Sequence, residues 1–306
     1  MYEIFTTLFV LLAAGVLFRY LPGVPPADVM RRAIGAMVLN IFLPALTFGV
    51  LVTAPITMDL VAIPAVAMIT AMASFGVAWV VFARLMRPRL TSAAIGTLLL
   101  ATTFCNATYL GLPVVSAVVG AEYARVAILF DLLGMSLILF TVGTVISVEY
   151  GTRGQRHTVA EGLRQVATLP PFLAAVAGLG INLSGIDVPD VVMNVTDVAG
   201  RVVAPAMLFS IGLALRMPKL SVLPILAPSL IIKLVIAPAI GALLIGAMIS
   251  DVQVARATLL EAAMPTMVLT IVFAERYGLD EELLAQAVLF STIVSMATLP
   301  VVAAMW

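Results

Sequence analysis

The chain has 306 residues, of which 63% are hydrophobic and 10% are charged. Soluble domains carry about 45–50% apolar and about 25% charged residues, so this composition excludes an ordinary soluble protein and predicts an integral membrane protein. The 16 basic and 16 acidic residues balance to zero net charge, which gives no sign of a nucleic-acid partner.

Apolar runs long enough to cross a bilayer, about 20 residues each, recur along the whole chain. They predict an all-α membrane protein with ten transmembrane helices. In chain order the expected spans are 4–20, 30–52, 60–85, 91–119, 123–148, 169–183, 191–215, 220–249, 255–274 and 283–305. A polar stretch separates the first five from the last five, so we expect segments 1–149 and 169–306 joined by a short cytoplasmic loop, 150–168.

Basic residues fall unevenly on the loops between these spans. Only Arg125 and Arg256 lie on one side. Twelve lie on the other: Arg19, Arg31, Arg32, Arg84, Arg87, Arg89, Arg153, Arg156, Arg164, Arg216, Lys219 and Arg276. Because cytoplasmic loops carry the excess of Lys and Arg, we expect both termini outside.

The two halves resemble each other at an offset of about 160 residues. Residues 26–30 match 189–193, and residues 43–48 match 204–209. Five spans in each half require the second copy to insert upside down, which predicts an inverted 5+5 repeat. Chance matching in an apolar sequence of low diversity is the alternative.

The fourth span cannot be a plain helix. Polar threonines surround Asn106, and Gly111 and Pro113 follow, so the backbone hydrogen bonds must be interrupted at membrane depth. The ninth span has the same fault around Pro265. Such breaks are tolerated where they line a cavity, so we expect spans four and nine to cross beside a binding site.

Half-helix ends at such a crossing suit an anionic group, because free N–H groups and the helix dipole both favour negative charge. Asn106 would add an amide donor, and Thr103 lies on the same helical face. The alternative is that Asn106 only satisfies the interrupted backbone.

Three ionisable residues inside spans are candidates for ion or proton coupling. Glu261 precedes Pro265 by four residues, on the same helical face. Asp131 and Lys233 have no opposite charge nearby in sequence and must pair across helices, snorkel or titrate. The alternative for Glu261 is a position close to the membrane surface.

Other features carry less functional information. Asp197 and Arg201, four residues apart, are typical of a local structural ion pair. The single cysteine, Cys105, excludes a Cys-rich metal site by count. The sequence holds no G-x-S-x-G, H-E-x-x-H, P-loop or dinucleotide motif, so we expect neither an enzyme nor a cofactor beyond a coupling H+ or Na+.

Three motifs resemble those of the auxin efflux carrier family, which includes bacterial malonate-type carriers. They are Asn106-Ala-Thr-Tyr-Leu-Gly-Leu-Pro113, Ala263-Met-Pro-Thr266, and Asn40-Ile-Phe-Leu-Pro-Ala45. The resemblance covers essentially the whole chain. It implies ten spans as an inverted repeat, a scaffold domain and a moving transport domain, and small organic anions as substrates. The resemblance to the bacterial carriers also implies a bacterial protein, and hence the inner (plasma) membrane.

The resemblance also implies roles for single residues. Asn106 would contact the substrate carboxylate, while Pro113 and Pro265 would define the crossing. The matched motifs add further substrate-binding candidates: Asn40, Thr108, Met264 and Thr266. The related bile-acid sodium symporters place a sodium-binding acid in the ninth span, which points to sodium near Glu261 as an alternative to a proton. A homodimer is expected by analogy.

The sequence therefore predicts a secondary active transporter of a small organic anion, such as malonate or an auxin-like acid, working by elevator-type alternating access among membrane lipids. The alternatives are a sodium-coupled symporter of the bile-acid type and a membrane sensor that binds a ligand without transporting it.

Overall fold

The computed structural model describes residues 2–154, 158–215 and 217–305. The regular secondary structure of these residues is helical, apart from one isolated β-bridge between Cys105 and Thr266. Six of the helices are long and apolar enough to cross a membrane, or seven if one bent pair is counted as a span. The expected all-α membrane class is therefore confirmed at this level.

The first half runs from α1 to α9. Its elements are α1 (Tyr2–Phe18), α2 (Ala27–Met37), η1 (Val38–Phe42), α3 (Leu43–Val52), α4 (Asp59–Trp79), η2 (Val80–Leu85), α5 (Ser92–Thr103), η4 (Ala107–Gly111), α6 (Leu112–Val118), α7 (Ala124–Leu129), η6 (Phe130–Met135), α8 (Ser136–Ile138), η7 (Leu139–Gly143) and α9 (Thr144–Tyr150). The named η elements are π-helical turns, and most of them continue a helix without a break.

The second half runs from α10 to α18. Its elements are α10 (Val159–Ala167), α11 (Pro170–Ser184), α12 (Asp190–Gly200), α13 (Val203–Ala214), α14 (Leu223–Ile231), η9 (Ile232–Ile236), α15 (Ala237–Met248), α16 (Val252–Ala262), α17 (Thr270–Tyr277) and α18 (Glu281–Ala304).

Helix α10 lies within segment 150–168, which the sequence predicts to be a short cytoplasmic loop. Thr158 and Glu161 form a capping box, in which the Thr158 N–H donates to Glu161 Oε2 at 2.9 Å and the Glu161 N–H donates to Thr158 Oγ1 at 3.3 Å. This reciprocal capping starts a helix in a polar stretch that hydropathy alone does not detect. Residues 155–157 of the expected loop, with Arg156, and Arg216 lie outside the described residues.

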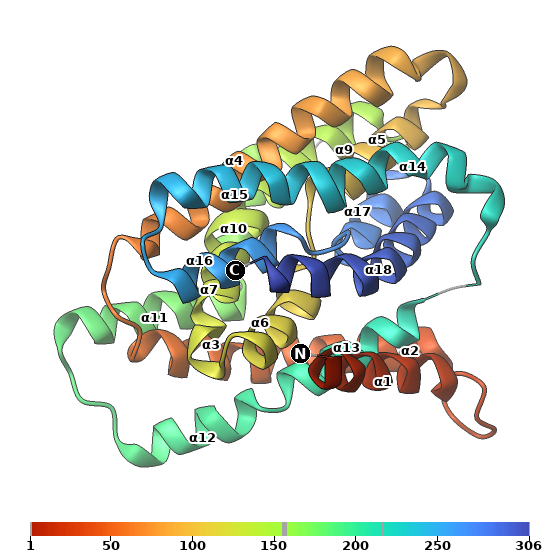
Figure 1. The fold of residues 1–306 in the computed structure, drawn as a ribbon. Helices are drawn as coiled ribbons and strands as arrows, with labels where there is room; N and C mark the ends of the chain where they lie inside the picture. The colour runs from red at the N-terminus through yellow and green to blue at the C-terminus, as the bar shows by residue number, and fades with distance from the viewer. Residues whose placement is uncertain (1, 155–157, 216, 306) are drawn as a thin grey trace.

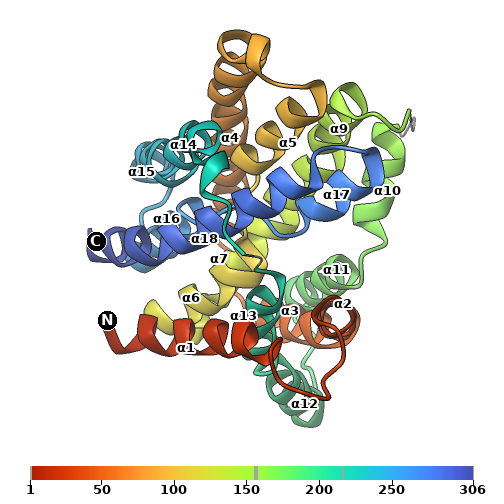
Figure 2. The same ribbon diagram turned by 90° about the vertical axis from the view of Figure 1, so that its right-hand side faces the viewer.

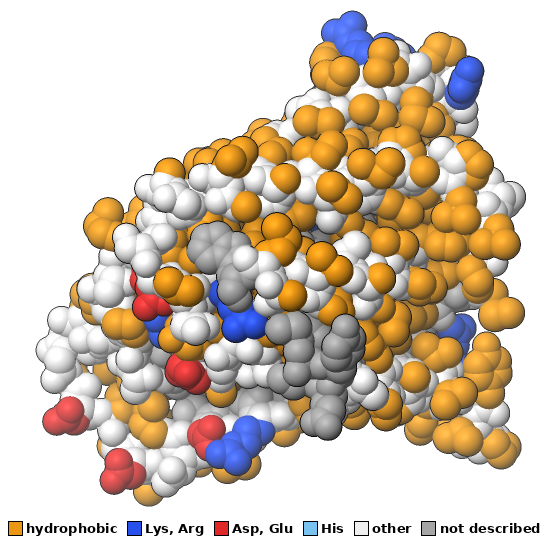
Figure 3. All heavy atoms as spheres, viewed as in Figure 1, with side chains coloured by type: hydrophobic (Ala, Val, Ile, Leu, Met, Phe, Trp, Pro, Cys, Tyr) orange, Lys and Arg blue, Asp and Glu red, His pale blue; other side chains and the backbone are white. Residues whose placement is uncertain are grey.

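The helices form two groups that lie side by side (Figures 1 and 2). In one group α3 packs on α11 and α12, and α13 packs on α1 and α2. In the other, α4 packs on α5, α15 and η6, and α15 packs on α16. Elements η4, α6 and α7 lie where the groups meet, because η4 and α6 contact α13 and α7 contacts α3. Figure 3 shows a face covered mostly by hydrophobic side chains, as expected of a protein surrounded by lipid.

Helices α1 and α13 approach each other through two glycines. A Cβ placed on Gly212 would collide with the Leu12 carbonyl oxygen and lie 2.9 Å from Gly15 Cα. A Cβ on Gly15 would in turn meet the backbone of Phe209 and lie 3.0 Å from Gly212 Cα. Small residues allow such contacts between membrane helices, whose association depends on van der Waals packing.

We therefore expect Gly212→Ala to lower the thermal midpoint of the purified protein, at a cost of about 1–3 kcal/mol, because the methyl group meets backbone that cannot rotate away. Gly76→Ala in α4 is the matched control, since nothing lies within 4 Å of a Cβ there. Equal midpoints for the two variants in the same detergent would contradict the close packing of α1 on α13.

Candidate functional site

Two broken helices meet at the centre of the molecule. Helix α5 ends at Thr103 and α16 ends at Ala262, and the extended residues that follow each of them pair with one another. The Asn106 N–H donates to the Pro265 carbonyl at 2.8 Å, and the Met267 N–H donates to the Phe104 carbonyl at 3.0 Å. Each non-helical segment thus provides hydrogen-bond partners for backbone groups of the other. Unpaired N–H and C=O groups, which are costly in an apolar interior, are avoided at these positions.

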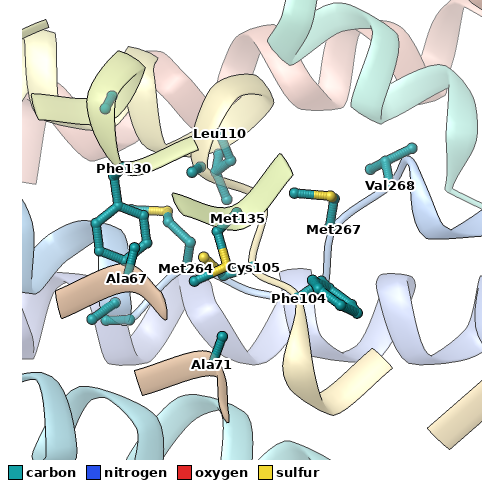
Figure 4. Close-up of a cluster of buried hydrophobic side chains, with 14 of the residues drawn as sticks. Ala67, Ala71, Phe104, Cys105, Leu110, Phe130, Met135, Met264, Met267 and Val268 are labelled. Carbon is teal, nitrogen blue, oxygen red and sulfur yellow. The ribbon is translucent and has the colours of Figure 1, made fainter. Parts of the chain in front are cut away.

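Thr266 connects this crossing to α5 and α18 through hydrogen bonds. Its hydroxyl donates to the Ala101 carbonyl at 2.8 Å, and its N–H donates to Ser291 Oγ at 3.1 Å. The predicted binding residue Thr266 therefore already uses both donors within the protein. Met264 is fully buried, and Figure 4 shows it beside Cys105 and Met135 on an apolar side of the crossing.

A small polar cavity lies on another side of the crossing, with a volume of about 30 Å3. That is room for one or two water molecules. Its lining residues come from four elements or segments: Asn106, Thr108, Tyr109, Asp131, Ser136, Met267 and Leu269. The Asn106 side-chain nitrogen is buried without a hydrogen-bond partner. Asn106 therefore does not act as a side-chain cap, and its donors are free for a ligand.

Asp131 lies on the π-helical turn η6 and is only 7% exposed. The Thr108 hydroxyl donates to its Oδ2, and the Ser136 hydroxyl donates to Oδ1 at 3.4 Å. A π-helical turn brings residues five apart onto one side, which explains why Ser136 faces Asp131. The predicted candidates Thr108 and Asp131 are thus in direct contact at the cavity.

Glu261 lies in the last turn of α16 and is fully buried. Neither of its carboxyl oxygens has a hydrogen-bond partner. Gly111 packs directly on this carboxyl group, so that a Cβ at Gly111 would collide with it. The carbonyl end of a helix disfavours a negative charge, and a buried anion without a partner is costly, so this geometry disfavours a bare carboxylate at Glu261.

Lys233 lies on the π-helical turn η9 and is 2% exposed. Its Nζ donates to the Thr103 carbonyl at 3.2 Å, at the C-terminal end of α5. An ammonium group favours that end of a helix because the dipole is negative there. The expected partner across helices is thus a carbonyl oxygen, while the Thr103 hydroxyl beside it is buried without a partner.

One turn connects the two acids. Within η4, Thr108 contacts Asp131 and Gly111, three residues later, contacts Glu261. Sequence reasoning missed Gly111 as a contact of Glu261, and it missed the cavity residues Tyr109, Ser136, Met267 and Leu269. The five-residue spacing between Asp131 and Ser136 was the one available signal, but it has meaning only in a π-helical turn.

Two predicted residues lie away from the crossing. Asn40 is exposed on η1, and its side chain donates to the Ala36 carbonyl at 2.7 Å. Pro113 does not lie at the break, which falls at residues 104–106; it lies inside the continuous helix Ala107–Val118, where η4 passes into α6. Pro265 does lie in the crossing. Asp197 and Arg201 form the expected ion pair, at 2.7 Å on the surface.

No group of three or more His, Cys, Asp or Glu side chains gathers to hold a metal ion within the described residues. The crossing therefore offers one amide, several hydroxyls and three ionisable groups, which is chemistry for binding a small ligand and a proton or monovalent cation.

Comparison with known proteins agrees with this geometry. The family described as "Membrane transport protein" matches residues 6–303. An "Uncharacterized transporter" of Methanothermobacter thermautotrophicus is 30% identical, covering 97% of this chain and 96% of the relative. An "Uncharacterized transporter" of Methanocaldococcus jannaschii is 25% identical over 71% of this chain and 69% of its own. A "Putative malonate transporter" of Rhizobium meliloti is 28% identical over 52% of this chain and 51% of its own.

The contact between Gly111 and Glu261 gives a double-mutant test. Gly111→Ala should destabilise the protein by about 1–3 kcal/mol, since the methyl group displaces the carboxyl group. In a Glu261→Ala background the same change should cost little, because the space is then empty. Gly180→Ala, where nothing lies within 4 Å of a Cβ, is the control. Equal costs of Gly111→Ala in both backgrounds, measured by chemical denaturation, would contradict the contact.

Proposed function

This chain belongs to the membrane transport protein family of the auxin efflux carriers, and from that premise we propose that it is a secondary active transporter of a small organic anion. Elevator-type alternating access would carry the anion across the membrane. The observation that carries the proposal is the crossing of two broken helices around an unpartnered Asn106 amide. Members of this family are transporters and not generally enzymes, and we propose no reaction for this chain.

We propose ten spans arranged as an inverted 5+5 repeat, with repeats at 1–149 and 169–306. The six or seven long apolar helices support part of this count. The remainder would come from shorter apolar helices, α1 and the two halves of each broken span. The two groups of helices supply a natural division into a scaffold, α1–α3 with α11–α13, and a moving part that carries the crossing.

The substrate would bind where these groups meet, with its carboxylate on Asn106. The position of the cavity between η4, η6 and the segment before α17 supports this assignment. At about 30 Å3 the cavity is smaller than a dicarboxylate, so binding would require the two groups to separate. Such separation is the motion that alternating access needs. The name of the Rhizobium meliloti relative makes malonate the first substrate to test.

Glu261 would carry the coupling ion. Its buried, unpartnered carboxyl group supports a proton as the first choice. The same two free oxygens also favour a second candidate function, a sodium-coupled symporter, in which Na+ would occupy the place of the proton. Asp131 would respond to ligand binding through its hydrogen bond with Thr108. Lys233 would stabilise the C-terminal end of α5 through its hydrogen bond to the Thr103 carbonyl.

For its setting in the cell, we propose the inner membrane of a bacterium with both termini outside. The excess of basic residues on one set of loops supports this orientation. A homodimer is proposed by analogy with the family.

Asn106→Ala should weaken malonate binding roughly ten- to hundredfold, the usual effect of losing a hydrogen bond to a charged group. The crossing should survive, because its bonds use the Asn106 backbone and not its side chain. Asn40→Ala is the matched control and should bind normally, since Asn40 already bonds to its own helix. Calorimetric titration of malonate into both purified variants measures the two affinities. An affinity of Asn106→Ala equal to that of the wild type would show that Asn106 does not bind the substrate.

Glu261→Gln should abolish uptake that is driven by an ion gradient, because the amide can neither gain nor lose a proton. In proteoliposomes, malonate uptake is measured with a pH gradient or a sodium gradient alone. Stimulation of the wild type by one gradient identifies the ion, and Glu122→Gln, an exposed acid on the short turn before α7, should keep that stimulation. Unaltered gradient dependence in Glu261→Gln would assign coupling to another group.

A further inference from the structure

An apolar groove opens on the outer surface between α15 and α18. Its volume is about 420 Å3, within the range of ligand-binding cavities. The lining is aliphatic except for one hydroxyl: Leu234, Val235, Pro238, Ala239, Ala242, Leu259, Ala297, Thr298, Val301, Val302 and Met305. Figure 1 shows α15 and α18 on the same side of the molecule with α16 between them.

The groove runs along one face of α18 and is open along its edges. Its α18 residues, at 297, 298, 301, 302 and 305, repeat at the spacing of a single helical face. Val235, Val301 and Met305 on its edges are 58%, 62% and 67% exposed. In a membrane, a surface of this kind faces hydrocarbon, so the occupant must be apolar where it touches these side chains.

A cation lies at one end of the groove. Arg256 is one turn before the lining residue Leu259, and its Nη2 donates to the Ala303 carbonyl at 3.0 Å, between Val302 and Met305. Its Nε is buried without a partner, and no carboxylate pairs with Arg256 among the described residues. A partly buried guanidinium without an anion has unused capacity for bidentate recognition of phosphate.

The depth of Arg256 fits the boundary between hydrocarbon and headgroups. It lies about 6 Å along α16 from the first residue, Val252, and beside the last turn of α18. Long basic side chains at such positions reach the level of lipid phosphates. One ligand therefore fits both ends: an apolar chain for the groove and a phosphate for Arg256.

We propose that this groove binds one anionic phospholipid, with an acyl chain between α15 and α18 and its phosphate on Arg256. The Thr298 side chain also lines the groove, and its buried hydroxyl has no hydrogen-bond partner within the protein. A zwitterionic lipid fits the groove equally well but has less net attraction to Arg256. The proposal does not depend on which substrate the protein carries.

Native mass spectrometry of the purified protein tests the proposal, with phosphatidylglycerol and phosphatidylcholine of identical chains as probes. The wild type should retain one phosphatidylglycerol roughly fivefold more tightly than phosphatidylcholine, the effect of one basic residue near an anionic headgroup. Arg256→Gln should lose that preference and keep the weaker binding. Arg256→Lys, which retains the charge, should keep most of the preference and guards against a simple folding defect.

A second pair of variants tests whether the groove binds the acyl chain of the lipid. Ala297→Phe fills the groove from an exposed position and should lower the binding of both lipids, whereas Ala304→Phe, exposed on the same helix outside the lining, should leave both unchanged. Equal retention of the two lipids by the wild type, or a preference that survives in Arg256→Gln, would overturn the phosphate contact. Full binding by Ala297→Phe would overturn the groove as the acyl-chain site.

Discussion

The structure depends on one constraint: main chain that leaves a helix inside an apolar molecule must find other hydrogen-bond partners. Two segments meet this constraint by pairing with each other, through Asn106 with Pro265 and Met267 with Phe104. Four half-helices are thereby fixed end to end around one point. The polar groups that follow, from Asn106 to Glu261, are positioned by this pairing, and no long loop is needed to carry them.

Three π-helical turns of the neighbouring helices lie around the same point. Thr108 and Gly111 lie on η4, Asp131 lies on η6 and Lys233 lies on η9, and all three elements are π-helical turns. A π-helical turn widens a helix locally and shifts which side chains share a face, which is why such turns occur frequently at functional sites. Here they direct polar side chains inward from helices whose other faces must remain apolar.

The sequence was sufficient to identify the centre of this arrangement. A proline, an amide and a carboxylate inside apolar runs are each unfavourable in contact with lipid and therefore indicate a buried polar site. Asn106, Pro265 and Glu261 were found in this way. The position of the break was harder to predict: the sequence pattern placed it at Pro113, but the chain leaves the helix at residues 104–106, and Pro113 lies inside the helix Ala107–Val118. Asn40 was selected by motif alone, and its exposure depends on packing that no local pattern encodes.

The three buried ionisable groups differ in how they are compensated, and this difference orders their roles. Lys233 donates to a carbonyl oxygen at a helix end, and Asp131 accepts from two hydroxyls, so each has a hydrogen-bond partner within the protein. Glu261 has no such partner and touches Gly111 on the turn that Asn106 begins. Any change of charge at Glu261 acts on this turn directly. In the proposed mechanism, a ligand on Asn106 and a proton or cation on Glu261 would act at the two ends of η4, so that each could alter the affinity for the other.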